Sequence, residues 1–258
     1  MNDDQNGVYE KRYYRFLHEG GDLKYFHIKI KETDLAIGVD AENYTDSLLS
    51  LCRHEVIRLR KELENYIEIH PHFLVSFVPL ELLPAAPEIA VRMGKAASLA
   101  GVGPMAAVAG AIAQAVGEIL RKHVEEVMVE NGGDIYIDSS KERIIAVFAG
   151  KSRFSYKIGI RVKTGESPLG ICTSSGTVGP SFSFGRADAA VIKGFPTELA
   201  DAVATRAGNL VKTEDDLIKA VEYAKNIKGV TGILLIKGEK MAAWGDIELV
   251  PIRANITN

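Results

Sequence analysis

The chain has 258 residues, of which 47% are hydrophobic and 25% charged, and its formal net charge is −3. That hydrophobic fraction is ample for a large core, and the slight negative charge argues against a nucleic-acid-binding surface. Two cysteines in this length argue against a disulfide scaffold and fit a reducing compartment. The N-terminal stretch MNDDQNGVYEKRYYRF lacks an apolar core after a basic start, so we predict no signal peptide and a cytoplasmic protein.

The first 80 or so residues predict a hairpin, a long helix and a short strand. RYYRFL and KYFHIKIKETDLAIGV alternate apolar and polar residues around the turn signal at residues 19–22. Apolar residues then recur at three- and four-residue spacing, which predicts a helix from Thr45 or Asp46 to about Ile69. The apolar run FLVSFVPL after it is predicted to be a short strand.

An Ala-rich stretch follows at residues 96–117, AASLAGVGPMAAVAGAIAQAVG, and it is uncharged over a membrane-spanning length. Ala and Gly favour insertion weakly, and GVGP breaks the stretch. We therefore predict two buried helices, the first starting between Pro84 and Pro87 and the second at Pro104. A membrane span is the minor alternative. Such small residues also pack well between subunits, so a homo-oligomer stays open.

Strand patterns dominate from Glu125 onward. We predict hairpins around the Gly-Gly of ENGGDI and within GVTGILLIKGEKMAAWG, with strands in RIIAVFAG, SYKIGIRV and AAVIKG. A helix is predicted from Thr197 to a C-cap at Gly208 and Asn209, and another after the capping-box pair Thr213 and Asp216. Together these elements predict a single α+β domain over residues 1–258, with helices packed on a largely antiparallel sheet.

Three short motifs carry side chains suited to ligand chemistry. In ENGGDI, Gly132 and Gly133 allow close backbone approach and Asp134 can accept hydrogen bonds, although a plain turn explains the same residues. Asp201 and Thr205 share one helix face and suit Mg²⁺ or Ca²⁺, although an ordinary polar face does too. The run from residue 170 to 189 holds Cys172 beside donors suited to phosphate, namely Thr173, Ser174, Ser175 and Gly176. The alternative for this run is a strand end with a buried thiol.

The order of these motifs resembles the ApbE family of FAD-binding, Mg²⁺-dependent flavin transferases. The resemblance covers about residues 110–245, and its blocks are GAIAQAVG, ENGGDI, KIGIRV, ICTSSG, ADAAVIKG, ELADAVATRAGN and GILLIKGEKMAAWG. The first hundred residues differ from that family. The whole chain resembles a shorter ApbE-like family of anaerobic archaea and bacteria, members of which are linked to sulfide mobilisation for homocysteine synthesis.

The resemblance implies roles for named residues. Asp201 and Thr205, with a backbone carbonyl near Ala113, stand where the flavin transferases hold their divalent cation. The turn at residues 132–134 matches the part that contacts the cofactor. Ser175 and Gly176 match a Thr-Ser-Gly block, with Ser174 an equal contender. Two features depart from the pattern: its Ala-Lys-Gly is here Ala113-Gln114-Ala115, and TVGPSFSFGRAD contains no histidine.

Three functions follow as hypotheses. In the first, Cys172 carries a persulfide in homocysteine or cysteine synthesis together with partner proteins, its thiol pKa lowered by N–H donors and a nearby metal. Cys52 lies in an apolar helix stripe and is predicted to be core, with a second relay role as the alternative. The other two hypotheses are transfer of FMN from FAD to a protein threonine, and a non-catalytic flavin- or nucleotide-binding module. No membrane partner is expected.

Two positional predictions complete the sequence interpretation. Asp201 and Thr205 should face a cleft shared with Asp134, and the stretch at residues 170–185 should form one wall of it. An anion should bind there rather than at His70 and His72, which form no recognisable metal site.

Overall fold

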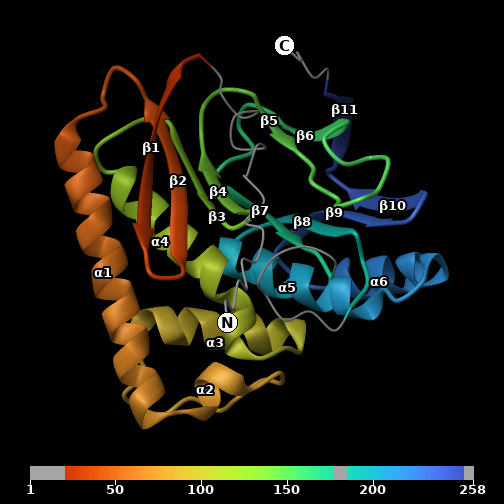
Figure 1. Cartoon of the computed structure of the whole chain (residues 1–258), viewed down its shortest axis with the longest axis horizontal. Helices are drawn as coiled ribbons and strands as arrows, with labels where there is room; N and C mark the ends of the chain where they lie inside the picture. Colours follow the sequence, from red (N-terminus) through yellow and green to blue (C-terminus); the bar gives the residue numbers. More distant parts are fainter. Residues whose placement is uncertain (1–20, 177–184, 253–258) are drawn as a thin grey trace, which may run out of the picture.

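The computed structural model describes residues 21–176 and 185–252, which form layered α and β structure (Figure 1). The middle layer is an eight-stranded sheet in which every neighbouring pair is antiparallel. Its strands, in spatial order, are β1 (Leu23–Ile30), β2 (Thr33–Asp40), β3 (Val127–Asn131), β4 (Asp134–Asp138), β7 (Leu169–Ser174), β8 (Ala189–Gly194), β9 (Val230–Lys237) and β10 (Lys240–Gly245).

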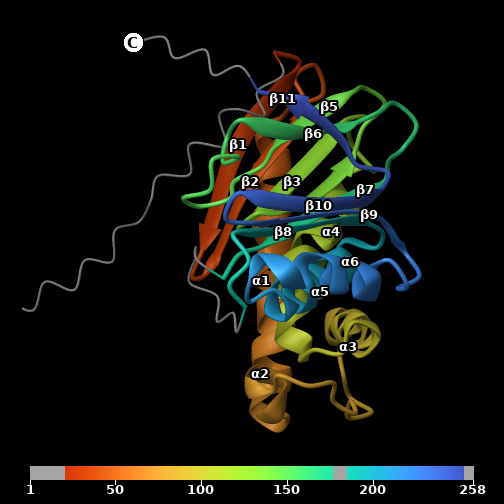
Figure 2. The same ribbon diagram turned by 90° about the vertical axis from the view of Figure 1, so that its right-hand side faces the viewer.

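Helices cover one face of this sheet and a smaller sheet covers the other (Figure 2). The helices are α1 (Asp46–Ile69), α2 (His72–Val75), α3 (Glu88–Ala100), α4 (Val108–Leu120), α5 (Thr197–Leu210) and α6 (Leu217–Ala224). The small sheet has the order β11 (Glu248–Pro251), β6 (Ile158–Val162), β5 (Arg143–Ala146). Strand alternation separates two cores, since Cys172 packs on the helix side and its neighbour Ile171 on the small-sheet side. The α+β class with a mostly antiparallel sheet is confirmed.

The long first helix is confirmed with the predicted boundaries. It runs from Asp46 to Ile69 after the N-cap Thr45. Its buried stripe consists of Leu48, Cys52, Val56, Leu59, Leu63 and Tyr66. These positions follow the helical period, so one face packs into the core while the charged face stays in solvent.

The first hairpin differs from the prediction. Its strands are β1 and β2, and the chain reverses at Lys31 and Glu32 rather than at residues 19–22. Lys31 adopts φ 52°, the left-handed conformation a tight reversal requires. The predicted strand RYYRFL lies outside the described residues.

The predicted strand in FLVSFVPL is wrong. Its first residues form the one-turn helix α2, in which the Ser76 N–H donates to the His72 carbonyl at 3.0 Å. Only Phe73 of this turn is buried. No described strand pairs with this segment, so apolar character alone does not make it part of the sheet.

The Ala-rich stretch forms the predicted pair of core helices. Gly101 ends α3 in the left-handed conformation, with φ 63°, and a 3₁₀ turn at Pro104–Ala107 leads into α4. Within residues 21–176 and 185–252 no single helix is long and apolar enough to cross a membrane. The pair passes that test together, but it is bent by 102°.

In the second half, the hairpins β3–β4 and β9–β10 and the capping box of Thr213 and Asp216 are confirmed. Helix α5 runs on past Gly208 to Leu210, so the predicted C-cap is wrong. Gly185 allows its backbone to approach the end of α5 closely, because a Cβ on Gly185 would lie 1.8 Å from the Gly208 carbonyl oxygen. The sequence did not predict β11 or the separate small sheet.

Candidate functional site

The candidate site lies where β4 and β7 meet the helices α4 and α5. Asp134, the first residue of β4, is the cross-strand partner of Cys172 on β7. Helix α5 runs alongside β7: a Cβ on Gly170 would lie 2.8 Å from Thr197 Cα, and a Cβ on Gly208 would lie 3.6 Å from Ser174 Oγ. Asp201 and Thr205 lie between these two contacts along α5. The fold thus brings Asp134, Cys172 and Asp201 together from distant parts of the sequence.

The Cys172 side chain is fully buried among these elements. Its Sγ donates a hydrogen bond to the Thr197 carbonyl oxygen at 3.4 Å. The thiol therefore has a structural partner at the first residue of α5.

Asp201 caps the N-terminus of α4. Its Oδ2 accepts a hydrogen bond from the Gly110 N–H at 2.9 Å. A Cβ on Gly110 would lie 2.7 Å from the Thr197 carbonyl oxygen and 2.9 Å from Asp201 Cβ, so this approach of the two helices requires glycine. The carboxylate sits at the positive end of the α4 dipole, where negative charge is stabilised. Nothing in the sequence pattern revealed this contact.

The surroundings of Asp134 and Asp201 disfavour the charged form of both carboxyl groups. Burial, followed by the charge of Asp201, raises the pKa of Asp134 well above its ordinary value, while the Cys172 thiol opposes this. Burial raises the pKa of Asp201 to about 7, although N–H groups of Gly110 and Ala109 lower it. Protonation or a bound cation would neutralise this unfavourable buried charge.

The electrostatics around Cys172 run opposite to the sequence interpretation. Burial raises the pKa of the Cys172 thiol, and the charges of Asp134 and Asp201 raise it further. The expected lowering of this pKa is therefore not found in the protein without a cation. Neutralising the two carboxylates is the change that would favour the thiolate.

The oxygen atoms in this region are suited to binding a hard cation. Asp134 Oδ1 and Thr197 Oγ1 are buried and have no hydrogen-bond partner among the described residues. Thr205, one turn from Asp201, is half-buried. Mg²⁺ and Ca²⁺ prefer such oxygen ligands. Within the described ranges, however, no group of three or more His, Cys, Asp and Glu side chains is arranged as a metal centre, so hydroxyl, carbonyl or water oxygens would have to complete the coordination.

Ala113 lies inside α4, and helix carbonyls point toward the C-terminal end. Asp201 contacts the opposite end of that helix, at Gly110. The assignment of the Ala113 carbonyl as a cation ligand therefore stays a prediction.

Gln114 occupies the position where the resemblance expects a lysine. Its Oε1 accepts a hydrogen bond from the Thr197 N–H at 2.6 Å, and its Nε2 donates to Glu118 Oε1 at 2.7 Å. The Gln114 side chain thus supplies a hydrogen-bond acceptor for an N–H group in the first turn of α5, which has no partner within the helix. Gln114 is a structural residue in this arrangement, a role the sequence did not predict.

The turn at residues 132–134 is tied to the same region. Gly132 and Gly133 have φ 70° and 110°, values that favour glycine. The Gly133 N–H donates to Glu130 Oε1 at 2.9 Å. Asn131 Nδ2 donates to the Ala109 carbonyl at 3.1 Å, which fixes the turn against the start of α4.

The Ser/Thr run continues from β7 into this region. Thr173, Ser174 and Ser175 are half-buried, and the Gly176 N–H donates to the Ala187 carbonyl at 3.0 Å. Residues 177–184 lie outside the described structure, so the prediction that the whole stretch forms a wall remains a prediction.

Asp134, Cys172 and Asp201 are all buried. A pocket of about 370 Å³ lies elsewhere and is lined by Glu166, Pro168, Leu169, Lys193, Gly194, Phe195, Gly229, Thr231 and Asp246. The cleft shared by these residues remains a prediction, because residues 177–184, which follow the Ser/Thr run, lie outside the described structure.

Cys52 and His70 belong to α1 and its C-cap, not to the elements that form the candidate site. Cys52 is buried in the α1 stripe, where burial raises its pKa to about 12. Helix α1 packs on α3, α4 and β1. The His70 ring contacts Tyr66, with Nδ1 3.1 Å from its hydroxyl.

The raised pKa of Asp201 predicts a pH-dependent stability in cation-free protein. With a folded pKa of about 7 against an ordinary 3.8, only the folded state holds this proton between those values. The contribution of this Asp201 proton to the free energy of unfolding therefore falls as pH rises through that window, by about 1.4 kcal/mol per pH unit. Asp201→Asn removes this slope, so the free energy of unfolding of the variant should rise relative to that of the wild type as pH rises.

Urea unfolding in EDTA across this pH range measures the effect. Asp215→Asn is the control because the Asp215 side chain is 94% exposed, and its curve should parallel that of the wild type. Parallel curves for Asp201→Asn and the wild type would contradict the raised pKa.

Comparison with solved structures defines the class of fold. The apo form of the flavinyl transferase ApbE from Pseudomonas stutzeri superposes with a TM-score of 0.55, covering 86% of this chain and 94% of that one. The sequences are 12% identical, so the likeness concerns the fold.

Sequence comparison identifies the family. The family model described as "AbpE bacteria" matches residues 15–231. A UPF0280 protein of Methanococcus aeolicus is 39% identical, covering 85% of this chain and 89% of the relative. A UPF0280 protein of Methanocaldococcus jannaschii is 38% identical, covering 89% and 94%. The chain therefore belongs to this ApbE-like family, together with the UPF0280 proteins.

Proposed function

We propose that this chain is a sulfur carrier within the flavin transferase superfamily, acting with partner proteins in homocysteine or cysteine synthesis. Cys172 holds the transferred sulfur. The observation that supports the proposal is that Cys172 on β7 is the cross-strand partner of Asp134 on β4, in the region that also contains Asp201. A thiol at the centre of an ApbE-like site offers chemistry that a hydroxyl there would not.

The proposed step transfers one sulfur atom without a net redox change. The Cys172 thiolate attacks the outer sulfur of a persulfide donor, R–S–SH. A new S–S bond forms on Cys172 as the donor S–S bond breaks, and the donor leaves as the thiolate R–S⁻. The product is the persulfide Cys172–S–SH, and a partner protein then accepts its outer sulfur.

Divalent cation binding is proposed to prepare the thiol for this step. Asp134 and Asp201 both raise the thiol pKa, and a cation between their oxygens would cancel that repulsion. Asp201 and Thr205 would hold the cation from α5, and Asp134 from β4. Because Cys172 is buried, the site has to open for the donor to reach it, and the loading rate should reflect that opening.

Intact mass spectrometry after incubation with a low-molecular-weight persulfide tests the proposal. The wild type with Mg²⁺ should gain one sulfur atom, and Cys172→Ala should gain none. Cys52→Ala is the matched control because it also removes a buried thiol, and it should load like the wild type. Equal loading of Cys172→Ala and the wild type would reject the proposed role.

A second candidate is flavin nucleotide binding, with or without transfer of FMN to a protein threonine. The fold likeness to the Pseudomonas stutzeri enzyme and the glycine turn at residues 132–134 favour it. Titration of FAD into the protein with Mg²⁺ distinguishes the candidates, because saturable FAD binding without sulfur loading supports the second alone.

A further inference from the structure

The pocket of about 370 Å³ lies at one end of the large sheet, where β7 and β9 begin and β8 and β10 end. We call it the Lys193 pocket, after the lysine among its lining residues. Lys193 pairs with Ile171, which packs on the small-sheet side, whereas the neighbouring Cys172 packs on the helix side. Residues opposite each other on paired strands share a face. Lys193 and Cys172 therefore lie on opposite faces of the sheet, and the pocket is a second site.

A buried ammonium group lines this pocket. Lys193 is only 3% exposed, and its Nζ donates to Glu166 Oε2 at 2.8 Å and to the Asp246 carbonyl oxygen at 3.1 Å. An ammonium group has three N–H donors, and no third acceptor is found among the described residues. A buried donor without a partner is costly. A ligand oxygen that accepts from Lys193 would remove that cost.

A carboxylate without a partner belongs to the same pocket. Asp246 is exposed, and its side chain makes no hydrogen bond or ion pair with the residues that the structure describes. Its main chain is fixed, because its N–H donates to the Thr231 carbonyl at 2.8 Å and its carbonyl accepts from Lys193. Two carboxylates, Glu166 and Asp246, stand against the one ammonium of Lys193 in the lining. Since Glu166 is paired with Lys193, the Asp246 carboxylate remains to bind a ligand ammonium.

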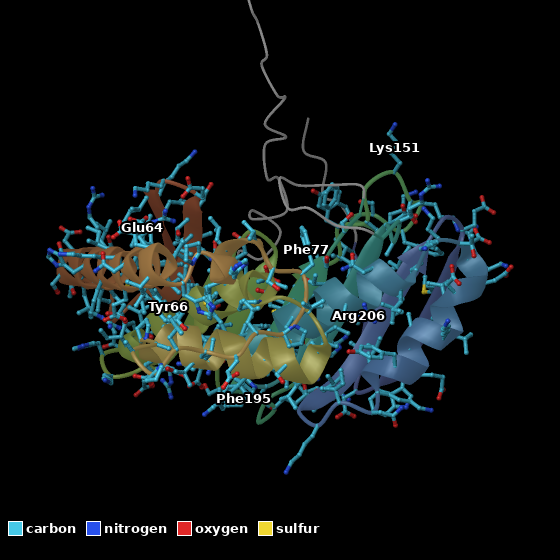
Figure 3. All side chains as sticks on the ribbon, turned by 90° about the horizontal axis from the view of Figure 1, so that it is seen from below. Glu64, Tyr66, Phe77, Lys151, Phe195 and Arg206 are labelled. Carbon is cyan, nitrogen blue, oxygen red and sulfur yellow. The ribbon has the colours of Figure 1, made fainter. Side chains whose placement is uncertain are left out.

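Apolar side chains supply another part of the lining, namely Pro168, Leu169 and Phe195. Phe195 is 42% exposed, and Figure 3 shows it at the outer margin of the molecule. The backbone beside it is closely packed: the Phe195 N–H donates to the Gly229 carbonyl at 2.9 Å, and a Cβ on Gly229 would lie 2.6 Å from the Phe195 carbonyl oxygen. The pocket thus combines a fixed apolar wall with a few polar groups, as small-molecule sites do.

We propose that the Lys193 pocket binds a free α-amino acid with an apolar side chain. The α-carboxylate accepts from Lys193 Nζ, the α-ammonium donates to the Asp246 carboxylate, and the side chain packs on Leu169 and Phe195. A simple anion would be repelled by Asp246, and a simple amine would leave the third N–H of Lys193 unpaired. A zwitterion meets both requirements. The volume of about 370 Å³ falls in the range of small-molecule sites. This site is independent of the proposed sulfur carrier.

Isothermal titration calorimetry of the full chain with L-leucine, L-methionine and L-phenylalanine tests the proposal. At least one of them should bind saturably with a Kd of about 1 mM or tighter. For L-leucine, the matched probes are isoamylamine, which lacks the carboxylate, and isocaproate, which lacks the ammonium. Each should bind at least about 10-fold more weakly than the best amino acid, because each loses a charge-assisted hydrogen bond. Absence of saturable binding by all three amino acids overturns the proposal, as does equal binding of either matched probe.

Asp246→Asn tests the assigned ammonium partner. The variant should bind the best amino acid about 10-fold or more weakly, because the hydrogen bond from the ligand ammonium loses its charged acceptor. Asp215→Asn is the control, since the Asp215 side chain is 94% exposed and lies outside the pocket lining. It should bind like the wild type. Unchanged affinity in Asp246→Asn overturns the assignment.

Backbone amide NMR shifts of the wild type locate the bound amino acid without a variant. Titration should shift the amides of Gly194, Gly229 and Thr231, which line the pocket, and leave those of Gly132 and Gly133 in place. Shifts confined to the glycine turn would overturn the pocket as the binding site. That outcome is distinguishable from failure of the sulfur carrier, which persulfide loading tests separately.

Discussion

FMN transfer from FAD to a protein threonine is expected to be at least about 10²-fold slower than with the Pseudomonas stutzeri enzyme, since losing one preorganised stabiliser of transition-state charge costs about 10²- to 10³-fold. Gln114 stands where the resemblance expects a lysine, and both ends of its amide are hydrogen-bonded, to Thr197 and to Glu118. The side chain is neutral and already engaged. It therefore supplies no charge to a pyrophosphate in the transition state.

A flavinylation assay with a fluorescent gel readout measures this, using a threonine-containing acceptor and the Pseudomonas stutzeri enzyme as positive control. Cys172→Ala is assayed in parallel. FMN transfer at the rate of the positive control, unchanged in Cys172→Ala, would contradict the sulfur proposal and restore the flavin transferase.

Divalent cations are expected to stabilise the wild type strongly. Binding only to the folded state adds about 2.7 kcal/mol when the cation is at one hundred times Kd, which corresponds to a rise in Tm of roughly 5–10 °C for a chain of this size. The physical reason is that Asp134 and Asp201 are buried carboxyls with raised pKa values, and a cation compensates both. Asp201→Asn and Asp134→Asn should each lose most of this rise.

Differential scanning calorimetry with Mg²⁺, Ca²⁺ and EDTA makes the measurement. Asp215→Asn again serves as control and should keep the full rise. Without a cation, Asp134→Asn should be at least as stable as the wild type at neutral pH, because an amide carries no charge to bury. An equal rise in the wild type and both site variants would place cation binding elsewhere.

The parts of the fold that the sequence predicted are those governed by local periodicity. The stripe from Leu48 to Tyr66 follows the helical repeat over its whole length, and the glycine turn between β3 and β4 has the dihedrals its residues favour. FLVSFVPL misled because most of its apolar residues after Phe73 are exposed at the surface instead of paired in a sheet. Hydrophobicity alone does not show whether a segment is covered.

The site was predictable only as a set of residues. Asp134, Cys172 and Asp201 were each identified from short motifs or from the resemblance, and the fold brings them together. Their electrostatics depend on burial and on one another, which no spacing reveals. The roles of Gly110 and Gln114 depend on contacts with α5, 83 or more residues away in the sequence. Such contacts exist only once the helices have packed.

The most direct test of the sulfur-carrier proposal is peptide mapping after persulfide loading with Mg²⁺, with persulfides trapped by alkylation before digestion. The account predicts the additional sulfur on the peptide that contains Cys172, with loading reduced in Asp201→Asn. A modified peptide containing Cys52 alone would show that the buried thiol of α1 carries the sulfur. Absence of any sulfur on the Cys172 peptide in a protein that folds and binds Mg²⁺ would contradict the account.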